Sequence, residues 1–178
     1  MIPAGRQQGS LSMRIVTRNR ILLVLALVLS VLVAAERMGA FRTEPSGSSP
    51  AVETLTIETG DGRLVPFRVE LALTAEQKMQ GLMHRDHLDQ DGGMLFLSDT
   101  DDVMGMWMKN TLIPLDIVFI TADGRIANIV PDAVPGDLTP LMSRGPVRAV
   151  LEINGGLASK LGLKSGDRVL YPAFGPDR

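Results

Sequence analysis

Residues 104–120, MGMWMKNTLIPLDIVFI, hold the single Trp of the chain, alternating methionines, a Lys-Asn-Thr triplet and a long apolar run. The end of this run, DIVFI, consists of residue types that favour β-strands. It continues into TADGRIANIV, in which Asp123-Gly124 is a typical turn between two paired strands. Residues 116–130 are therefore predicted to form a β-hairpin.

The flanking sequence has the pattern of further short strands. We expect strands at 52–59, 64–73, 92–97 and 147–153, and a short helix, a tight glycine turn and a last strand within 155–171. Thr74 and Gln77 have the spacing of a capping box, which predicts a helix over 75–83. Pro66 indicates an edge position or an irregular strand start. Loops are expected at 99–102 and 131–140.

Six to eight short strands, two short helices and many turns predict a mainly β or α+β domain, with a compact antiparallel sandwich- or barrel-like fold. The sequence shows no strand–helix–strand alternation and no glycine-rich phosphate loop, so a parallel nucleotide-binding sheet is not expected. A serine-nucleophile elbow of the Gly-x-Ser-x-Gly type is also absent.

Composition excludes several function classes. The chain has no Cys, which rules out disulfides, thiolate zinc sites and cysteine nucleophiles. Residues 51–178 contain 12 Lys/Arg and 18 Asp/Glu, a net charge of −6, and the basic residues are scattered. Sequence-independent nucleic-acid binding needs a basic surface, so we expect no nucleic-acid partner.

The N-terminal part has the features of an export signal. Three arginines within residues 13–20 precede ILLVLALVLSVLVAA at 21–35, an apolar run ended by small residues. We expect residues 1–12 to be an over-extended start, 13–41 a signal peptide or signal-anchor, 42–51 a flexible linker and 52–176 the globular domain. The expected location is periplasmic or extracytoplasmic, with residues 21–35 as a membrane anchor if they are not cleaved, and with no other membrane contact.

Polar residues within the apolar stretch suggest a site. Lys109, Asn110 and Thr111 either bond to nearby backbone as turn residues or line a small polar pocket with Trp107 as its wall. Asp116 lies between Leu115 and Ile117, where a carboxylate needs a partner, with Lys109 or Arg85 as the candidates.

The alternating methionines have two interpretations. In an extended segment over 104–110, Trp107 and Lys109 share one face, and Met104, Met106 and Met108 share the other, where methionine fills irregular cores well. Alternatively, they bind Cu(I) with His84, because thioethers select this ion. The sequence favours core packing over this metal site, and no other cofactor is expected.

Five segments, taken in order, resemble the DUF192 family, also called UPF0127. They are GLMHR (81–85), GGMLF (92–96), WMKNTLIPLDIVFI (107–120), VLEINGG (150–156) and LGLKSGDRV (161–169). The resemblance covers about residues 53–174 and implies a compact mainly β domain but no particular activity. The family pattern includes Arg85, Trp107, Lys109, Asn110 and Asp116, whereas Met104, Met106 and His84 are not fixed parts of it.

We therefore expect an exported, non-enzymatic domain that binds a small ligand or an envelope partner. Its binding residues would be Trp107, Lys109 and Asn110, with Asp116 and Arg85 as supporting charges. The alternatives are a hydrolase acting on an envelope component and the Met-rich Cu(I) protein.

Overall fold

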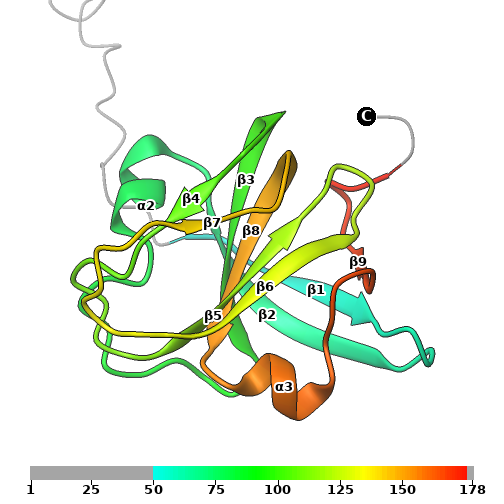
Figure 1. Cartoon of the computed structure of the whole chain (residues 1–178), viewed down its shortest axis with the longest axis horizontal. Helices are drawn as coiled ribbons and strands as arrows, with labels where there is room; N and C mark the ends of the chain where they lie inside the picture. Colours follow the sequence, from blue (N-terminus) through cyan, green and yellow to red (C-terminus); the bar gives the residue numbers. More distant parts are fainter. Residues whose placement is uncertain (1–49, 176–178) are drawn as a thin grey trace, which may run out of the picture. The chain divides into compact units, whose positions relative to one another are not determined.

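The computed structural model describes residues 50–175, which form one seven-stranded sheet, one two-stranded sheet and two short helices (Figure 1). The order in the large sheet is β6-β5-β8-β3-β2-β1-β9, and β4 pairs with β7. The prediction of a mainly β domain with two short helices is confirmed. The strands are β1 Val52–Glu58, β2 Leu64–Ala72, β3 Gly92–Asp102, β4 Gly105–Met106, β5 Leu115–Ile120, β6 Ile126–Ala133, β7 Leu141–Met142, β8 Val147–Asn154 and β9 Arg168–Leu170, and the helices are α2 Ala75–Gln80 and α3 Leu157–Leu161.

The large sheet curls, and its two edges meet at one end. β9 pairs with β1 at one edge, and its backbone also reaches the turn between β5 and β6 at the other edge. The N–H of Val169 donates to the carbonyl of Gly124 at 2.7 Å, and the N–H of Ile126 donates to the carbonyl of Asp167 at 2.9 Å. These bonds give the sheet a barrel-like closure at this end.

One strand pair is parallel, which the sequence did not predict. β2 pairs with β3 in parallel, and α2 lies in the crossover between them. The predicted capping box is present, because the Thr74 hydroxyl accepts the N–H of Gln77 and the Gln77 side chain accepts the N–H of Thr74. The helix ends at Gln80 rather than at residue 83, because Gly81 takes a positive φ of 48° that stops the helical hydrogen bonding.

Two strands are longer than predicted. β3 continues through the acidic residues 99–102, and β6 continues to Ala133, so both segments expected to be loops belong partly to strands. Pro66 lies in an interior strand, where it faces Thr56 of β1. The pairing of β2 with β3 begins only at Arg68, so the missing N–H of Pro66 costs no bond to β3.

Successive residues of each central strand alternate between two buried faces. The first, which we call the α3 face, is covered by α3 and β9 and includes Leu95, Val118 and Leu151. The second, which we call the loop face, includes Met94 and Phe96 and is covered by residues from segments 82–88 and 104–113. Burial of each large apolar side chain contributes about 2 kcal/mol, so both faces hold the covering segments in place.

The predicted signal, anchor and most of the linker lie outside the described residues. Within residues 50–175, no helix has both the length and the apolar character needed to cross a membrane.

Candidate functional site

Asp116 is a completely buried anchor on the α3 face of β5. Its Oδ1 accepts the backbone N–H groups of Asp132 and Gly156 at 2.8 and 2.9 Å, and its Oδ2 accepts the N–H of Ala158 at 2.7 Å. The prediction that Lys109 or Arg85 pairs with Asp116 is therefore wrong, because three backbone N–H groups bond to this carboxylate. Through these bonds Asp116 holds the start of α3 against β5.

Trp107 and Lys109 lie together, as the alternation of side chains predicted. The Lys109 ammonium nitrogen is 5.3 Å from the centre of the Trp107 ring, a cation–π distance. The Trp107 side chain is 51% exposed, so this contact lies at the surface. The extended conformation expected for 104–110 stops at Met108, and residues 109–110 form a turn.

Asn110 joins two segments that are far apart in the sequence. It takes a left-handed backbone conformation with φ 54°, which asparagine tolerates better than most residues. Its carbonyl accepts the N–H of His84 at 2.8 Å, and its side-chain amide donates to the Met83 sulfur at 3.9 Å. Asn110 therefore attaches the Trp107 segment to the end of the α2 crossover.

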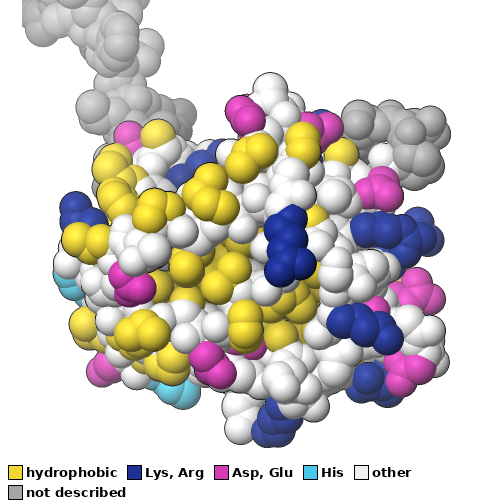
Figure 2. All heavy atoms as spheres, in the orientation of Figure 1, with side chains coloured by type: hydrophobic (Ala, Val, Ile, Leu, Met, Phe, Trp, Pro, Cys, Tyr) yellow, Lys and Arg dark blue, Asp and Glu magenta, His cyan; other side chains and the backbone are white. Residues whose placement is uncertain are grey.

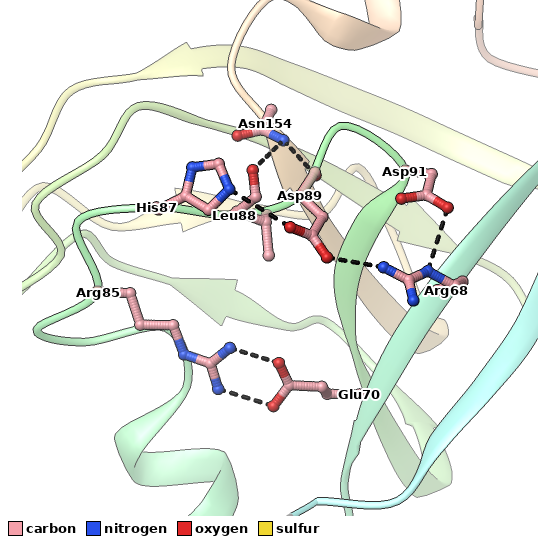
Figure 3. Close-up of polar contacts among 8 residues, drawn as sticks. All are labelled: Arg68, Glu70, Arg85, His87, Leu88, Asp89, Asp91 and Asn154. Carbon is pink, nitrogen blue, oxygen red and sulfur yellow. Dashed lines mark hydrogen bonds and ion pairs between the residues drawn. The ribbon is translucent and has the colours of Figure 1, made fainter.

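Arg85 pairs with Glu70 and lines a different pocket from Trp107 and Lys109. The guanidinium bonds both carboxylate oxygens, and its Nη2 lies 2.7 Å from Oε2 (Figure 3). Both side chains are mostly buried, and the bond to Glu70 raises the pKa of Arg85 above its ordinary value. The pair lines a pocket of about 280 Å³ with Arg68 and His87.

Of the predicted metal-binding residues, the three methionines pack in one core, and His84 is exposed outside it. Met108 is only 1% exposed and packs in the loop-face core, and Met104 and Met106 pack against the same core. His84 is exposed, with a left-handed backbone. The packing interpretation therefore accounts for the alternating methionines. Among the described residues, no group of three His, Asp or Glu side chains could hold a metal ion.

Glu152 is a buried acid that the sequence analysis did not single out. It lies on the loop face of β8, is 4% exposed and faces Met94 of β3 on one side and Ile117 of β5 on the other. No hydrogen bond or ion pair within residues 50–175 involves its carboxyl group, and burial raises its pKa to about 8. Every fully enclosed side-chain polar atom in that part of the chain has a partner, so the Glu152 oxygens retain some contact with open space.

That open space is a small pocket of about 30 Å³, which we call the Glu152 pocket. Trp107 and Lys109 line its rim, and the end of α2 forms another wall. The other lining residues are Lys78, Met79, Gln80, Gly81, Leu82, Met83, Phe96, Met106 and Thr111. Of the five predicted binding residues, the structure thus places Trp107 and Lys109 at one pocket and Asn110 beside it. Arg85 and Asp116 lie elsewhere.

A larger pocket of about 640 Å³ lies beside α3, and we call it the α3 pocket. One wall is loop 87–91, which Asn154 holds by donating to the carbonyls of Leu88 and Asp89 at 3.2 and 2.8 Å (Figure 3). Another wall is the Gly155-Gly156 turn, in which the N–H of Gly156 donates to the Asp116 carboxylate. Arg68 bonds Asp89 at 2.7 Å and Asp91 at 3.1 Å, and so fixes the same loop from the β2 side.

Apolar side chains also gather on the molecular face that carries β4 and β7 (Figure 2). Backbone bonds between Met108 and residues 136–137 join segment 103–112 to segment 134–142. Both segments expose large apolar side chains, namely Val103, Trp107, Leu112, Val134, Leu138 and Met142.

The sequence profile of the DUF192 family, described as "Uncharacterized ACR", matches residues 56–171, which is more than half of the chain. The chain belongs to the DUF192 family. This assignment confirms the resemblance found in the sequence. The matched residues include those that line the Glu152 pocket and the α3 pocket, as well as segments 103–112 and 134–142.

Solved structures of two other proteins resemble this chain. One, from Sinorhizobium meliloti 1021, is provisionally titled a transcription regulator. It is 41% identical with a TM-score of 0.70, over 72% of this chain and all of that one. Another, a protein of unknown function from Novosphingobium aromaticivorans DSM 12444, is 43% identical with a TM-score of 0.65, over 73% of this chain and 98% of that one. No curated protein matches the chain.

A sequence signal for Glu152 existed in this DUF192 chain. Glu152 lies within VLEIN, an acidic residue in an otherwise apolar strand, and the same signal drew attention to Asp116. The α3 pocket had no comparable signal, because its lining residues come from three separate parts of the chain, 65–67, 87–91 and 154–161.

Proposed function

We propose that this DUF192 domain is a non-enzymatic module that binds a small ligand, in the exported setting that its N-terminal sequence predicts. The α3 pocket carries the proposal. Its volume of about 640 Å³ lies within the range of about 300–1,000 Å³ that is usual for small-molecule sites. Among the predicted site residues, Asp116 supports one wall, and Arg85 pairs with Glu70 on the other side of loop 87–91. Trp107, Lys109 and Asn110 do not line this pocket.

The lining of the α3 pocket indicates the kind of ligand. Its body is apolar, and polar groups are confined to a few positions; the apolar lining residues are Val65, Pro66, Phe67, Leu88, Leu157 and Leu161. Asp91 is already paired with Arg68, which it shares with Asp89, whereas no ion pair of the described residues involves Lys160. A ligand with an apolar body and one negative group would complement this surface.

Binding fits the described residues better than hydrolysis does. The Asp116 carboxylate is occupied by three backbone donors, so it acts as a scaffold rather than as a general base. His87 lines the α3 pocket, but it is largely exposed and lies 3.3 Å from Asp89. These contacts position a wall of the pocket and do not form a pair of nucleophile and base.

Native mass spectrometry of the full chain tests the proposal, with a panel of small apolar carboxylic acids as probes. Lys160→Glu reverses the charge at the pocket, and Lys164→Glu is the matched control, because Lys164 is also exposed but does not line the pocket. We expect a carried-over or added acid to bind the wild type and Lys164→Glu, and to bind Lys160→Glu at least about 10-fold more weakly. A bare mass for all three proteins, with no rise in Tm from any probe, would reject a small-ligand function at this site.

The apolar surface formed by segments 103–112 and 134–142 favours an envelope partner as a second candidate function. Exposed apolar groups in adjacent segments are typical of protein interaction surfaces. Crosslinking in intact cells, with a photoreactive residue in place of Leu138, should then yield one defined adduct. The same residue in place of Leu64, on β2, is the control, because Leu64 is equally exposed.

A further inference from the structure

The Glu152 pocket combines a buried acid with three thioethers. Met79 and Met83 come from the end of the α2 crossover, four residues apart, and Met106 comes from β4. The Glu152 carboxyl, on β8, lines the same pocket and has no partner within the described residues. A buried carboxyl group without a partner is costly to keep, so its presence beneath an opening suggests that something binds there.

Two of these methionines are held in place by the structure. The Asn110 amide contacts the Met83 sulfur, and the carbonyl of the same residue bonds the N–H of His84. Met106 packs against the loop-face core and pairs in register with Leu141 of β7. Met79 is 67% exposed and can move toward or away from the opening. The pocket is therefore lined by two methionines that are held in place and by a third that can close over a ligand.

The volume of the Glu152 pocket and the types of donor atom that line it limit which ligands can bind there. A volume of about 30 Å³ is enough for an ion or one to two water molecules but not for an organic molecule. Calcium and magnesium need about six or more oxygen ligands, and the side chains of this pocket offer one carboxyl group, one hydroxyl and one amide oxygen. Thioether sulfur selects soft ions such as Cu(I).

We propose that the Glu152 pocket binds one soft monovalent metal ion, Cu(I) or its analogue Ag(I), through the sulfur atoms of Met83 and Met106, with Met79 as a mobile third donor. Glu152 compensates the charge of the ion, and the half-exposed Trp107 indole ring forms the rim. Lys78 and Lys109 also line the pocket, but both are exposed and can turn toward solvent. Their charges disfavour divalent ions more strongly than monovalent ones.

This site differs from the metal site predicted from the sequence. That set was Met104, Met106, Met108 and His84, and only Met106 lines the Glu152 pocket. The fold replaces the other three, because Met108 points into the core and the α2 crossover brings Met79 and Met83 to the opening. The new site is also independent of the α3 pocket, so either proposal can fail without the other.

Ag(I) titration of the full chain in chloride-free buffer tests the proposal. Native mass spectrometry gives the stoichiometry, and Trp107 fluorescence reports on this pocket because the chain has one Trp. The informative variants are Met83→Leu with Met106→Leu, which removes both sulfurs but keeps the volume, and Glu152→Gln, which removes the charge. Met104→Leu and Met142→Leu are controls from outside the pocket.

We expect one Ag(I) per chain with a change in Trp107 fluorescence. The double Leu variant should lose the site, and Glu152→Gln should weaken binding by about 10- to 100-fold. Both controls should bind as the wild type does, and circular dichroism should show that every variant is folded. Absence of stoichiometric Ag(I), full binding by the folded double variant, or an equal loss in Met104→Leu or Met142→Leu would overturn the assignment.

Discussion

Asp116 and Glu152 lie on neighbouring strands of one sheet, and their carboxyl groups point to opposite faces. In the pairing of β5 with β8, Asp116 is opposite Ile153 and Ile117 is opposite Glu152. The two acids therefore occupy adjacent positions in the register and do not face each other. On the α3 face, Asp116 receives three backbone N–H groups. On the loop face, Glu152 meets a small opening. One register thus produces both a structural anchor and a candidate binding group.

Replacement of Asp116 by Ala should destabilise the fold strongly. Three buried N–H groups would lose their acceptor, and each unsatisfied buried group costs about 1–3 kcal/mol, so we expect a loss of at least about 3 kcal/mol. Urea unfolding measures the change. Asp86→Ala is the control, because Asp86 is exposed, and it should stay within about 0.5 kcal/mol of the wild type. A loss below about 1 kcal/mol for Asp116→Ala would contradict the anchor role.

Glu152 should make the free energy of unfolding depend on pH up to about pH 8, which is above the range in which a carboxyl group ordinarily titrates. Burial raises its pKa from 4.5 to about 8, so between these values the folded protein keeps a proton that the unfolded chain releases. The free energy of unfolding therefore falls as pH rises, by up to about 1.4 kcal/mol per pH unit from this group.

Glu152→Gln removes this dependence. The variant should match the wild type near pH 5 and exceed it by a few kcal/mol near pH 8, as an order-of-magnitude expectation. Urea unfolding across this pH range, in buffers treated with a metal chelator, gives both curves. Parallel curves for the two proteins would show that the carboxyl group of Glu152 is not perturbed in the folded state.

The contact between Arg85 and Glu70 should show a measurable coupling energy. The pair is bidentate and mostly buried, so we expect about 1–2 kcal/mol of coupling, which is more than a typical exposed ion pair contributes. A double-mutant cycle with Arg85→Met and Glu70→Gln measures it. The exposed pair of Arg63 and Asp61 provides the comparison and should give less than about 1 kcal/mol. Equal coupling for the two pairs would argue against a special role for Arg85.

Gly93 should not tolerate a side chain. A Cβ atom at this position would lie 2.8 Å from the carbonyl oxygen of Glu152 on β8, and backbone cannot easily move away. Gly93→Ala should therefore cost about 1–3 kcal/mol in urea unfolding. Gly60→Ala is the matched control, because its nearest contact is the end of the Lys164 side chain at 3.5 Å, and it should be neutral or slightly stabilising. Tolerance of Ala at position 93 would mean that β3 and β8 are less closely paired there.

Much of the local structure could be predicted from the sequence. The capping box at Thr74 and Gln77 marked the start of α2 correctly, and the Asp123-Gly124 turn lies between β5 and β6 as expected. The class of the fold and the short helices were also predicted correctly. These features depend on residues within a few positions of one another, and for that reason their pattern is visible along the chain.

The site was harder to predict. The pairing of Trp107 with Lys109 followed from their alternation, but the separation of Arg85 and Asp116 from them did not. Asp116 belongs to the α3 face and Lys109 to a turn over the loop face, and only the register of β5 against β8 decides this. Likewise, the parallel pairing of β2 with β3 brings Met79 and Met83 above Glu152, which is about 70 residues later in the sequence.

The sequence by itself determined the class of the fold, the approximate positions of most strands and the start of α2, because hydrophobic periodicity and capping act over a few residues. The tertiary structure alone decided which buried acid received partners and where the pockets formed. Those outcomes depend on contacts between strands far apart in the chain, and a shift of β5 by one residue against β8 would place Asp116 and Glu152 on the same face.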